Sequence, residues 1–541
     1  MTWRAALLAC LMVLPLTLAA GTGPAAADAT PLRAAVNALG DGNYRDRAEA
    51  IAALAALGEP EVTPVLEALA AGRLFRRKSD GGVFIAERVG KSYALSDPLS
   101  GAAAGEAGRR AVKKIKVNNA LRRAIRDAIG ALTLRHPDPA VRAEAAAVMF
   151  KTADPANIAL LTAAFAAEEN DDIRAAMAEA RAAAVLNGEA GEADKLAAIE
   201  VVAGRGNREA LAVLLPLRDG AEGALRTAAD DAIGVIEERL LLIDVLQNVW
   251  YGISLGSVLL LAAIGLAITF GVMGVINMAH GEMVMLGAYT TYVVQEIFRS
   301  QFPGAFDYSL LVAIPAAFAV AGLVGLAIER GVIRFLYGRP LETLLATWGL
   351  SLILQQAVRS LFGPTNREVG NPSWMSGSVE LAGVVLTSNR IWIVVFAVLV
   401  FALLTLVIRR TRFGLQMRAV TQNRPMANAV GIRSGWVDAL TFGLGSAIAG
   451  MAGVALSQID NVSPNLGQSY IIDSFLVVVF GGVGNLWGTL VGALSLGVAN
   501  KFLEPYAGAV LGKILILVAV ILFIQKRPRG LFALKGRAVE A

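Results

Sequence analysis

Long uncharged apolar stretches occur in the second half of the chain. Residues 245–279 carry no formal charge over 35 positions, and 309–328, 391–408 and 439–458 are further uncharged stretches. About 20 apolar helical residues cross the ~30 Å hydrocarbon core of a bilayer, so each stretch is close to spanning length or longer. Shorter apolar runs lie at 283–295, 343–357, 471–496 and 514–525. The pattern predicts an all-α, polytopic membrane domain over residues 245–534, with about eight or nine spans.

The first half has a different periodicity. Between residues 28 and 244, apolar side chains recur every three or four positions, as in Leu121, Ile125, Ile129 and Leu132. This spacing predicts amphipathic helices, and pairs of helices repeating every 35–45 residues or so resemble a HEAT-type stack. One segment, Leu74–Ile85, alternates around a Ser-Asp-Gly-Gly turn and predicts a small β-hairpin. Helix starts are expected where an acidic residue precedes proline, at Glu59-Pro60, Asp138-Pro139 and Asp154-Pro155.

The first 27 residues have the pattern of a secretory signal peptide. Arg4 precedes an apolar run at 5–20, and Ala25, Ala26 and Ala27 form a small-residue cleavage site. An uncleaved anchor is the alternative, although the run is shorter than the ~20 residues of a span. Both interpretations export residue 28 onward. We therefore expect a bacterial inner-membrane protein with a periplasmic helical domain at 28–244.

Composition excludes several classes of function. Hydrophobic residues make up 56% of the chain and charged residues 17%, whereas soluble proteins carry about 25% charge. Two histidines, His136 and His280, and one cysteine, Cys10, cannot form a His/Cys zinc site, a disulfide framework or a Cys/His nucleophile pair. Gly90-Lys91-Ser92 is no phosphate-binding loop, because Ile85 stands where that motif needs glycine. No catalytic residue, metal or cofactor is expected.

The basic residues agree with one threading through the membrane. If the first span enters from outside, the cytoplasmic loops carry fourteen Lys and Arg and the outward loops six, as the positive-inside rule requires. Membrane lipid, not nucleic acid, then accounts for the net charge of +5. Residues 535–541 become a cytoplasmic tail. Six crossings bring the chain to the outside before residue 471, and a cytoplasmic carboxyl terminus then requires an odd number of further crossings. Residues 471–500 therefore form either two shortened crossings or a re-entrant pair, broken at the glycine-rich segment 481–485.

Polar side chains interrupt the apolar stretches and suggest a solute pathway. Asn277, His280 and Glu282 lie within six residues of one another. Polar groups at membrane depth usually face a cavity or a partner, although capping of two helices at the interface is an equal alternative. A neutral solute would need hydrogen-bond donors and acceptors instead of a full charge. Further candidates of this kind are Gln355, Gln356, Asn371, Asp473 and Asn485.

A basic loop between two spans, residues 412–432, is a candidate partner-binding segment. Its small residues Ala427, Ala429 and Gly431 suit a short helix laid into a groove of another protein, with Gly431 able to end that helix. A charged loop held only by lipid headgroups is the alternative.

Four strings together resemble a known family: Asn277–Glu282, the 412–432 loop, Ser446–Gly450 and Gly481–Gly488. They look like the membrane subunit of branched-chain amino acid-type ABC importers, over roughly residues 245–534. The added exported domain and the strings 346–356 and 371–374 are similar to the urea-transport branch. The resemblance implies a transport subunit, not an enzyme, that takes up urea or another small neutral amide.

The same resemblance implies partners and a coupling segment. Two cytoplasmic ABC ATPase subunits, a second permease subunit and a periplasmic solute-binding protein are expected. The segment that touches an ATPase would be Arg418–Ile432, with these candidate contact residues: Arg418, Asn423, Arg424, Ala427, Gly431 and Ile432.

Other functions remain open on the residues alone. A branched-chain amino acid permease has the same fold, but a zwitterionic solute would need paired charges or free helix ends. A membrane receptor with an exported ligand-binding domain would normally need a cytoplasmic output domain, and only residues 526–541 follow the last apolar run. A secondary transporter would need a proton or sodium relay. The 28–244 domain is expected to dock the binding protein or to brace the second permease.

Overall fold

The computed structural model describes residues 31–532 except 58, 60, 90 and 91, and divides the chain into two compact units. The first unit ends at Leu240 and the second begins at Leu241. This division falls inside one continuous helix, α10 (Gly223–Met273), as does the predicted boundary at 244/245. The signal peptide predicted at 1–27, with Cys10, and the tail predicted at 535–541 lie outside the described residues.

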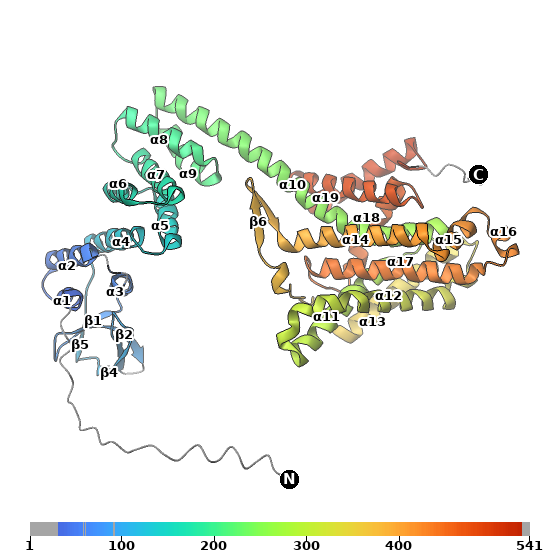
Figure 1. Ribbon diagram of the computed structural model, residues 1–541, viewed down its shortest axis with the longest axis horizontal. Coiled ribbons are helices and arrows are strands. Elements are labelled where there is room, and N and C mark those ends of the chain that lie inside the picture. Colours follow the sequence, from blue (N-terminus) through green and yellow to red (C-terminus); the bar gives the residue numbers. More distant parts are fainter. Residues whose placement is uncertain (1–30, 58, 60, 90–91, 533–541) are drawn as a thin grey trace, which may run out of the picture. The chain divides into compact units, whose positions relative to one another are not determined.

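The first unit consists mainly of short helices that pack in sequence order (Figure 1). Helices α1–α4 surround one apolar core, with Leu54, Leu66 and Leu121 buried, and α5–α9 surround another, with Phe150 and Met177 buried. The HEAT-type repeat stays a prediction. The bounds are α1 Pro31–Ala38, α2 Tyr44–Leu57, α3 Val62–Ala70, α4 Asn119–Leu134, α5 Pro139–Thr152, α6 Ile158–Ala167, α7 Asp171–Leu186, α8 Glu192–Arg205 and α9 Arg208–Gly220.

Helix starts in this unit follow the expected chemistry. Asp138 and Asp154 each accept a backbone N–H two residues on, and proline follows each of them. A proline in the first turn loses nothing, because its missing N–H would have had no helical partner. The starts predicted at Asp138-Pro139 and Asp154-Pro155 are therefore confirmed, the second as a short 3₁₀ turn that leads into α6.

The predicted hairpin is present but belongs to a larger sheet. β1 (Leu74–Arg77) pairs antiparallel with β2 (Val83–Val89), with Leu74 opposite Ile85. The sheet has five strands in the order β4-β3-β2-β1-β5, so the expectation of an all-helical domain with only a hairpin is wrong here. Strands β3 (Ser92–Ser96), β4 (Ala103–Gly108) and β5 (Val112–Lys114) were missed because they are short and rich in Ala, Gly, Ser or Lys.

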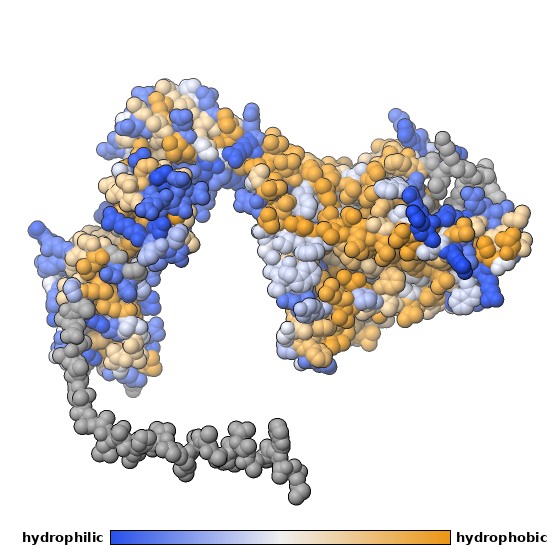
Figure 2. All heavy atoms as spheres, in the orientation of Figure 1, coloured by the Kyte–Doolittle hydropathy of each residue, from blue (hydrophilic) through white to orange (hydrophobic). Residues whose placement is uncertain are grey.

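The second unit is a bundle of long apolar helices. Among the described residues, five helices are long and apolar enough to cross a membrane: α10, α12 with its flanking turns, α14, α17 and α19. Figure 2 shows the apolar residues that cover this bundle. The remaining bounds are α11 His280–Gln301, α12 Ser309–Gly331, α13 Pro340–Phe362, β6 Ser378–Leu381, β7 Val384–Thr387, α14 Ser388–Arg410, α15 Arg412–Gln422, α16 Arg424–Ala429, α17 Ser434–Ser457, α18 Leu466–Gly481 and α19 Leu486–Lys526.

The predicted break at 481–485 is confirmed, because α18 ends at Gly481 and α19 begins at Leu486. The 16-residue α18 is short for a span. The 41-residue α19 is interrupted at Gly508, whose φ of 76° is non-helical. The exact number of spans stays a prediction.

Two sets of contacts define opposite ends of the bundle. At the end that carries α15 and α16, here called the α16 end, Leu531 and Phe532 donate backbone hydrogen bonds to Phe480 and Gly481. At the other end, here called the β6 end, Arg367 pairs with Val462 through two backbone hydrogen bonds. Figure 1 shows α16 and β6 at these two ends.

Glycines let the central helices touch backbone to backbone. A Cβ added at Gly287 of α11 would lie 2.0 Å from the carbonyl oxygen of Gly450 in α17, and one added at Gly453 would lie 2.0 Å from that of Val284. Apart from its two ends, α17 is almost entirely buried against α11 and α12. Small residues are the usual means by which membrane helices approach closely, since lipid gives no hydrophobic driving force between them.

Gly287→Ala should therefore destabilise the bundle, by about 1–3 kcal/mol if the overpacked site behaves like other crowded cores. Gly349 of α13 is the matched control, because a Cβ there meets nothing within 4 Å, and Gly349→Ala should be neutral or slightly stabilising. Thermal unfolding of the two purified variants in detergent checks this. Equal midpoints would contradict the packing assigned to Gly287.

Candidate functional site

The chain between α10 and α11 turns back into the bundle. His280 Nε2 lies 2.9 Å from the carbonyl oxygen of Ala262, although α10 continues from Ala262 to Met273, about 16 Å at 1.5 Å per residue. Residues 274–279 are not helical, and α11 begins at His280. Because His280 reaches back to Ala262, the start of α11 lies well inside the bundle. Non-helical backbone at membrane depth is tolerated only where protein buries it or where it lines a cavity, so residues 274–279 must be in one of these two situations.

A polar stripe on α13 faces this segment. Thr343, Thr347, Ser351 and Gln355 follow one another every four residues and are all buried. Ser351 Oγ donates to Glu282 Oε1 at 2.8 Å, and Thr347 Oγ1 accepts from the backbone N–H of Met278 at 3.1 Å. The residues four apart share one helix face. The stripe thus supplies one polar partner to the broken segment, through Thr347, and one to the first turn of α11, through Ser351.

Four buried polar atoms in this region make no hydrogen bond of good geometry with the described residues, although the Gln355 amide and the Glu282 carboxylate lie close enough to interact. They are Asn277 Oδ1, His280 Nδ1, Glu282 Oε2 and Gln355 Nε2, on side chains that are at most 6% exposed. The carbonyl of Ala262 only accepts, so His280 Nε2 donates and Nδ1 remains an acceptor. Unsatisfied buried polar groups are costly and rare in proteins. Together they form a place that can offer hydrogen bonds to a small polar molecule.

The other predicted pathway residues lie elsewhere. Gln356 and Asn371 are exposed. Asp473 of α18 makes an ion pair with Lys513 of α19 at 3.0 Å, and Asn485 caps α19 by accepting the N–H groups of Trp487 and Gly488. The structure brings together Asn277, His280, Glu282 and Gln355. The other four predicted residues, Gln356, Asn371, Asp473 and Asn485, are not part of this group. Thr347 and Ser351 were not predicted, although their four-residue spacing in an apolar helix was visible in the sequence.

The segment 412–432 folds into two short helices at the α16 end. Asn423 accepts from the N–H of Met426 and so caps α16. Gly431, with φ of 88°, follows the helix, as predicted for its end. Ala427 is buried, and Ile432 packs against the bundle core. Arg418 donates to the carbonyl oxygen of Ile408 at the end of α14.

Arg424 attaches α16 to the bundle. Its guanidinium makes two hydrogen bonds, of 2.6 and 3.0 Å, to the carboxylate of Asp438, which is fully buried in the first turns of α17. A bidentate arginine–carboxylate pair fixes both position and orientation. Any displacement of α16 therefore acts on the start of α17.

A second layer surrounds this pair. Arg424 lies over the ring of Tyr337, and Tyr337 donates to Glu329 Oε1 of α12 at 2.7 Å. Burial, then the negative charge of Asp438 and the hydrogen bond to Glu329, raise the pKa of Tyr337, so its hydroxyl stays protonated and remains the donor. The next residue of α12, Arg330, lies over the ring of Trp436. The network joins α12, α16 and α17.

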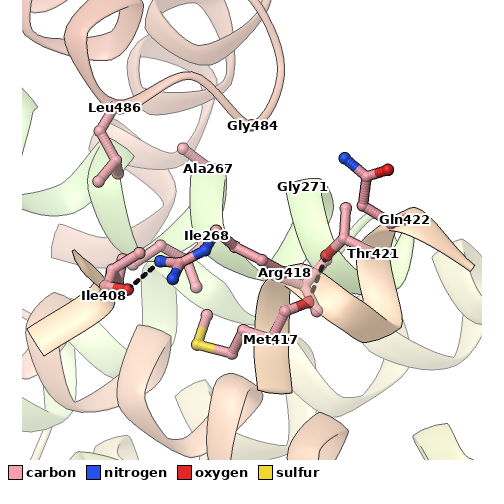
Figure 3. A pocket seen from close by; sticks show the side chains of 11 residues that line it. Ala267, Ile268, Gly271, Ile408, Met417, Arg418, Thr421, Gln422, Gly484 and Leu486 are labelled. Atoms are coloured by element: carbon pink, nitrogen blue, oxygen red, sulfur yellow. Dashed lines mark hydrogen bonds between the residues drawn. The ribbon is translucent and has the colours of Figure 1, made fainter. Parts of the chain in front are cut away.

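A cavity of about 310 Å³ opens beside α15 (Figure 3). It lies between the last turns of α10, the end of α14 and the 481–485 break. Figure 3 shows Arg418 extending across it toward Ile408. The lining residues are Ala267, Ile268, Gly271, Val272, Ile408, Met417, Arg418, Thr421, Gln422, Gly484 and Leu486. Movement of α15 would change its shape.

The outer surface of α15 and α16 is apolar with a basic surround. Leu415, Met426 and Val430 are at least 61% exposed, and the side chains of Arg412 and Arg433 are exposed nearby in the chain. Figure 2 shows strongly hydrophilic residues gathered at this end of the bundle. Exposed apolar residues rimmed by charge are typical of a surface that binds another protein.

Known proteins identify the class to which this bundle belongs. The family model of the permease component of branched-chain amino acid transport systems matches residues 248–524. The match covers just over half of the chain, and the chain belongs to this family of ABC transporter permeases. The expected transport role is confirmed at this level, and the receptor and secondary-transporter alternatives are set aside.

Individual relatives match the same region. The chain is 33% identical over 293 residues to the high-affinity branched-chain amino acid permease BraD of Pseudomonas aeruginosa, which covers 53% of this chain and 95% of that protein. It is 34% identical over 297 residues to the permease LivH of Escherichia coli K12, a match that covers 53% of this chain and 94% of LivH. The ribose import permease RbsC of Bacillus subtilis is 31% identical over 141 residues, covering 24% and 44%. No solved structure matches.

The Arg424–Asp438 pair predicts an asymmetric response to mutation. Asp438→Ala should destabilise the protein because it strands a partly buried guanidinium, by about 1–3 kcal/mol given that Arg424 is about a third exposed. The double variant Asp438→Ala/Arg424→Met removes both charges and should recover part of that loss. Thermal unfolding midpoints of the single and double variants show whether removing both charges recovers stability. A double variant no more stable than the single one would argue against the pair.

Proposed function

We propose that this chain is a permease subunit of an ATP-driven importer for urea or another small neutral amide. The observation that carries the proposal is the set of four unsatisfied groups around the start of α11. Asn277, His280 and Glu282 offer hydrogen-bond acceptors, and Gln355 offers an N–H donor. An amide or urea molecule presents N–H donors and a carbonyl acceptor, which is the complementary set.

The α16 surface is proposed as the contact with an ATPase subunit. Its exposed apolar residues, Met426 and Val430, suit insertion into a groove. Asn423 and Gly431 fix where the helix begins and ends, and Arg424 fixes it to Asp438. Two ATPase subunits, a second permease subunit and a solute-binding protein complete the proposed importer. ATP chemistry is assigned to the ATPase subunits.

A mechanical path joins the proposed ATPase contact to the polar site. Movement of α16 acts on α17 through Arg424 and Asp438. Helix α17 touches α11 backbone to backbone at Gly450 and Gly453, and α11 begins with His280 and Glu282. Packed helices transmit displacement because they deform little. ATP-driven closure would thus alternate the access of the polar site between the two sides of the membrane.

The orientation is part of the proposal. The exported first unit and the α16 end facing the cytoplasm follow from the signal pattern and the distribution of Lys and Arg. The contacts that gather α15, α16 and the 481–485 break at one end support this threading.

A branched-chain amino acid is the second candidate solute, because the relatives BraD and LivH carry that name. A zwitterion needs a cation or a free helix N-terminus for its carboxylate. The four groups around α11 include no lysine or arginine, but α11 itself begins at His280 within this site, so the amino acid stays a full alternative. Competition between solutes separates the candidates. Uptake of labelled urea that leucine does not reduce supports the amide, whereas uptake of leucine that urea does not reduce supports the amino acid.

Gln355→Leu should lower urea uptake at least about tenfold, because it removes the donor and leaves the acceptors unmatched. Gln356→Leu is the matched control, since Gln356 is exposed, and it should leave uptake unchanged. Initial rates in cells lacking the native gene, at matched expression, are the measurement. Equal rates for the two variants would remove Gln355 from the site.

Met426→Asp/Val430→Asp should abolish copurification of the ATPase subunits, because it places charge in the apolar surface of α16. Val379→Asp/Leu381→Asp on β6 is the control at the opposite end, where both side chains are also exposed. Affinity purification of the full complex compares them. ATPase retained by the α16 variant at the level of the control would contradict the proposed contact.

A further inference from the structure

Charge is unevenly distributed along the first unit. Residues 73–126 contain fourteen Lys and Arg and four Asp and Glu, whereas the rest of 28–244 contains fourteen and twenty-eight. One contiguous stretch therefore has a net charge of +10 and the remainder one of −14. Segregation on this scale creates a field that steers and orients a charged partner.

The sheet gathers part of this stretch along one edge, where side chains of successive residues project on its two faces. β5 is an edge strand that pairs with β1, with Lys113 opposite Arg76 and Lys114 opposite Phe75. The backbone N–H of Lys78 donates to the carbonyl of Ala111, which brings Lys78 to the turn before β5. We call the resulting surface the basic edge. It consists of Arg76, Arg77, Lys78, Arg109, Arg110, Lys113 and Lys114.

Most of these cations lack a counter-charge. Arg76 pairs with Asp41 and Arg77 with Asp80. Among the described residues, the other five make no ion pair, and all five are exposed. Like charges directly opposite in a sheet, such as Arg76 and Lys113, weaken strand pairing. One lysine would suffice to protect an edge strand from aggregation, so five unpaired cations indicate a binding role.

The surface has little apolar character. Between residues 73 and 126, Val89 is the one large apolar side chain among the described residues that is exposed by more than about a third. Segments that bind a bilayer surface combine basic residues with exposed apolar ones that insert between lipids. Charge without such residues favours a polar, acidic partner of protein nature, held by electrostatic complementarity.

The geometry points to the basic edge as the docking surface for an acidic face of the solute-binding protein. This inference rests on the proposed function, because it requires the first unit to be exported and the chain to serve an importer. It assigns to the first unit the task of capturing the loaded binding protein before the solute reaches the membrane helices.

The test measures binding of the purified cognate solute-binding protein, loaded with its solute, to the full-length transporter in phosphatidylcholine nanodiscs. Lys113→Glu/Lys114→Glu should weaken binding at least about tenfold at low ionic strength. Lys113→Gln/Lys114→Gln should weaken it less. Rising salt should weaken binding to the wild type. The matched control, Lys195→Glu/Arg226→Glu, reverses two cations of the same unit outside the basic edge and should bind as the wild type does.

Unchanged binding by the Lys113→Glu/Lys114→Glu variant, or binding to the wild type that is insensitive to salt, would overturn the inference. Protection of the basic edge from protease by phosphatidylglycerol nanodiscs alone, without the binding protein, would also overturn it by assigning the surface to lipid. Circular dichroism verifies that each variant is folded. Wild-type transporter that retains no ATPase subunit would instead overturn the proposed function, which keeps the two failures distinct.

Discussion

Every backbone polar group inside a bilayer must find its partner within the protein, and the irregular segment 274–279 depends on that constraint. Helices satisfy it automatically, but a chain that leaves α10 and restarts as α11 beside Ala262 does not. The Thr347 hydroxyl accepts a hydrogen bond from the backbone N–H of Met278, and the His280 side chain donates one to the carbonyl of Ala262. Within the polar stripe of α13, Thr347 bonds the break and Ser351 bonds the helix that follows it. A bundle of plain helices would have no use for this stripe.

The same break creates functional capacity. The hydrogen bonds that satisfy the segment leave other donors and acceptors beside it without a well-formed bond, on Asn277, Glu282 and Gln355. Their placement beside α17 matters because that helix touches α11 through glycine contacts and touches α16 through an ion pair. A polar site, a stiff central helix and the proposed ATPase contact are thus joined in one mechanical series. Each part alone would be unremarkable in a membrane protein.

The sequence predicted most of what depends on local chemistry. Glycine-rich breaks at 481–485 and after α16 were visible because no other residue adopts those backbone angles easily. The partners of Glu282 were not, because Ser351 lies 69 positions away and only packing brings it near. Gln355 and Gln356 were indistinguishable until the face of α13 was known. Strands β3–β5 escaped notice because sheet neighbours, not their own residues, stabilise them.

Access of water to the broken segment tests the central claim most directly. Ser351→Cys, in a chain whose Cys10 is replaced by serine, should react with a membrane-impermeant thiol reagent from one side of the membrane at rest and lose or reverse that access when the ATPases are trapped with ATP. Leu352→Cys, on the exposed face of the same helix, should react in neither state. Absence of labelling at residue 351 in every nucleotide state would mean that the polar site lies on no solute pathway.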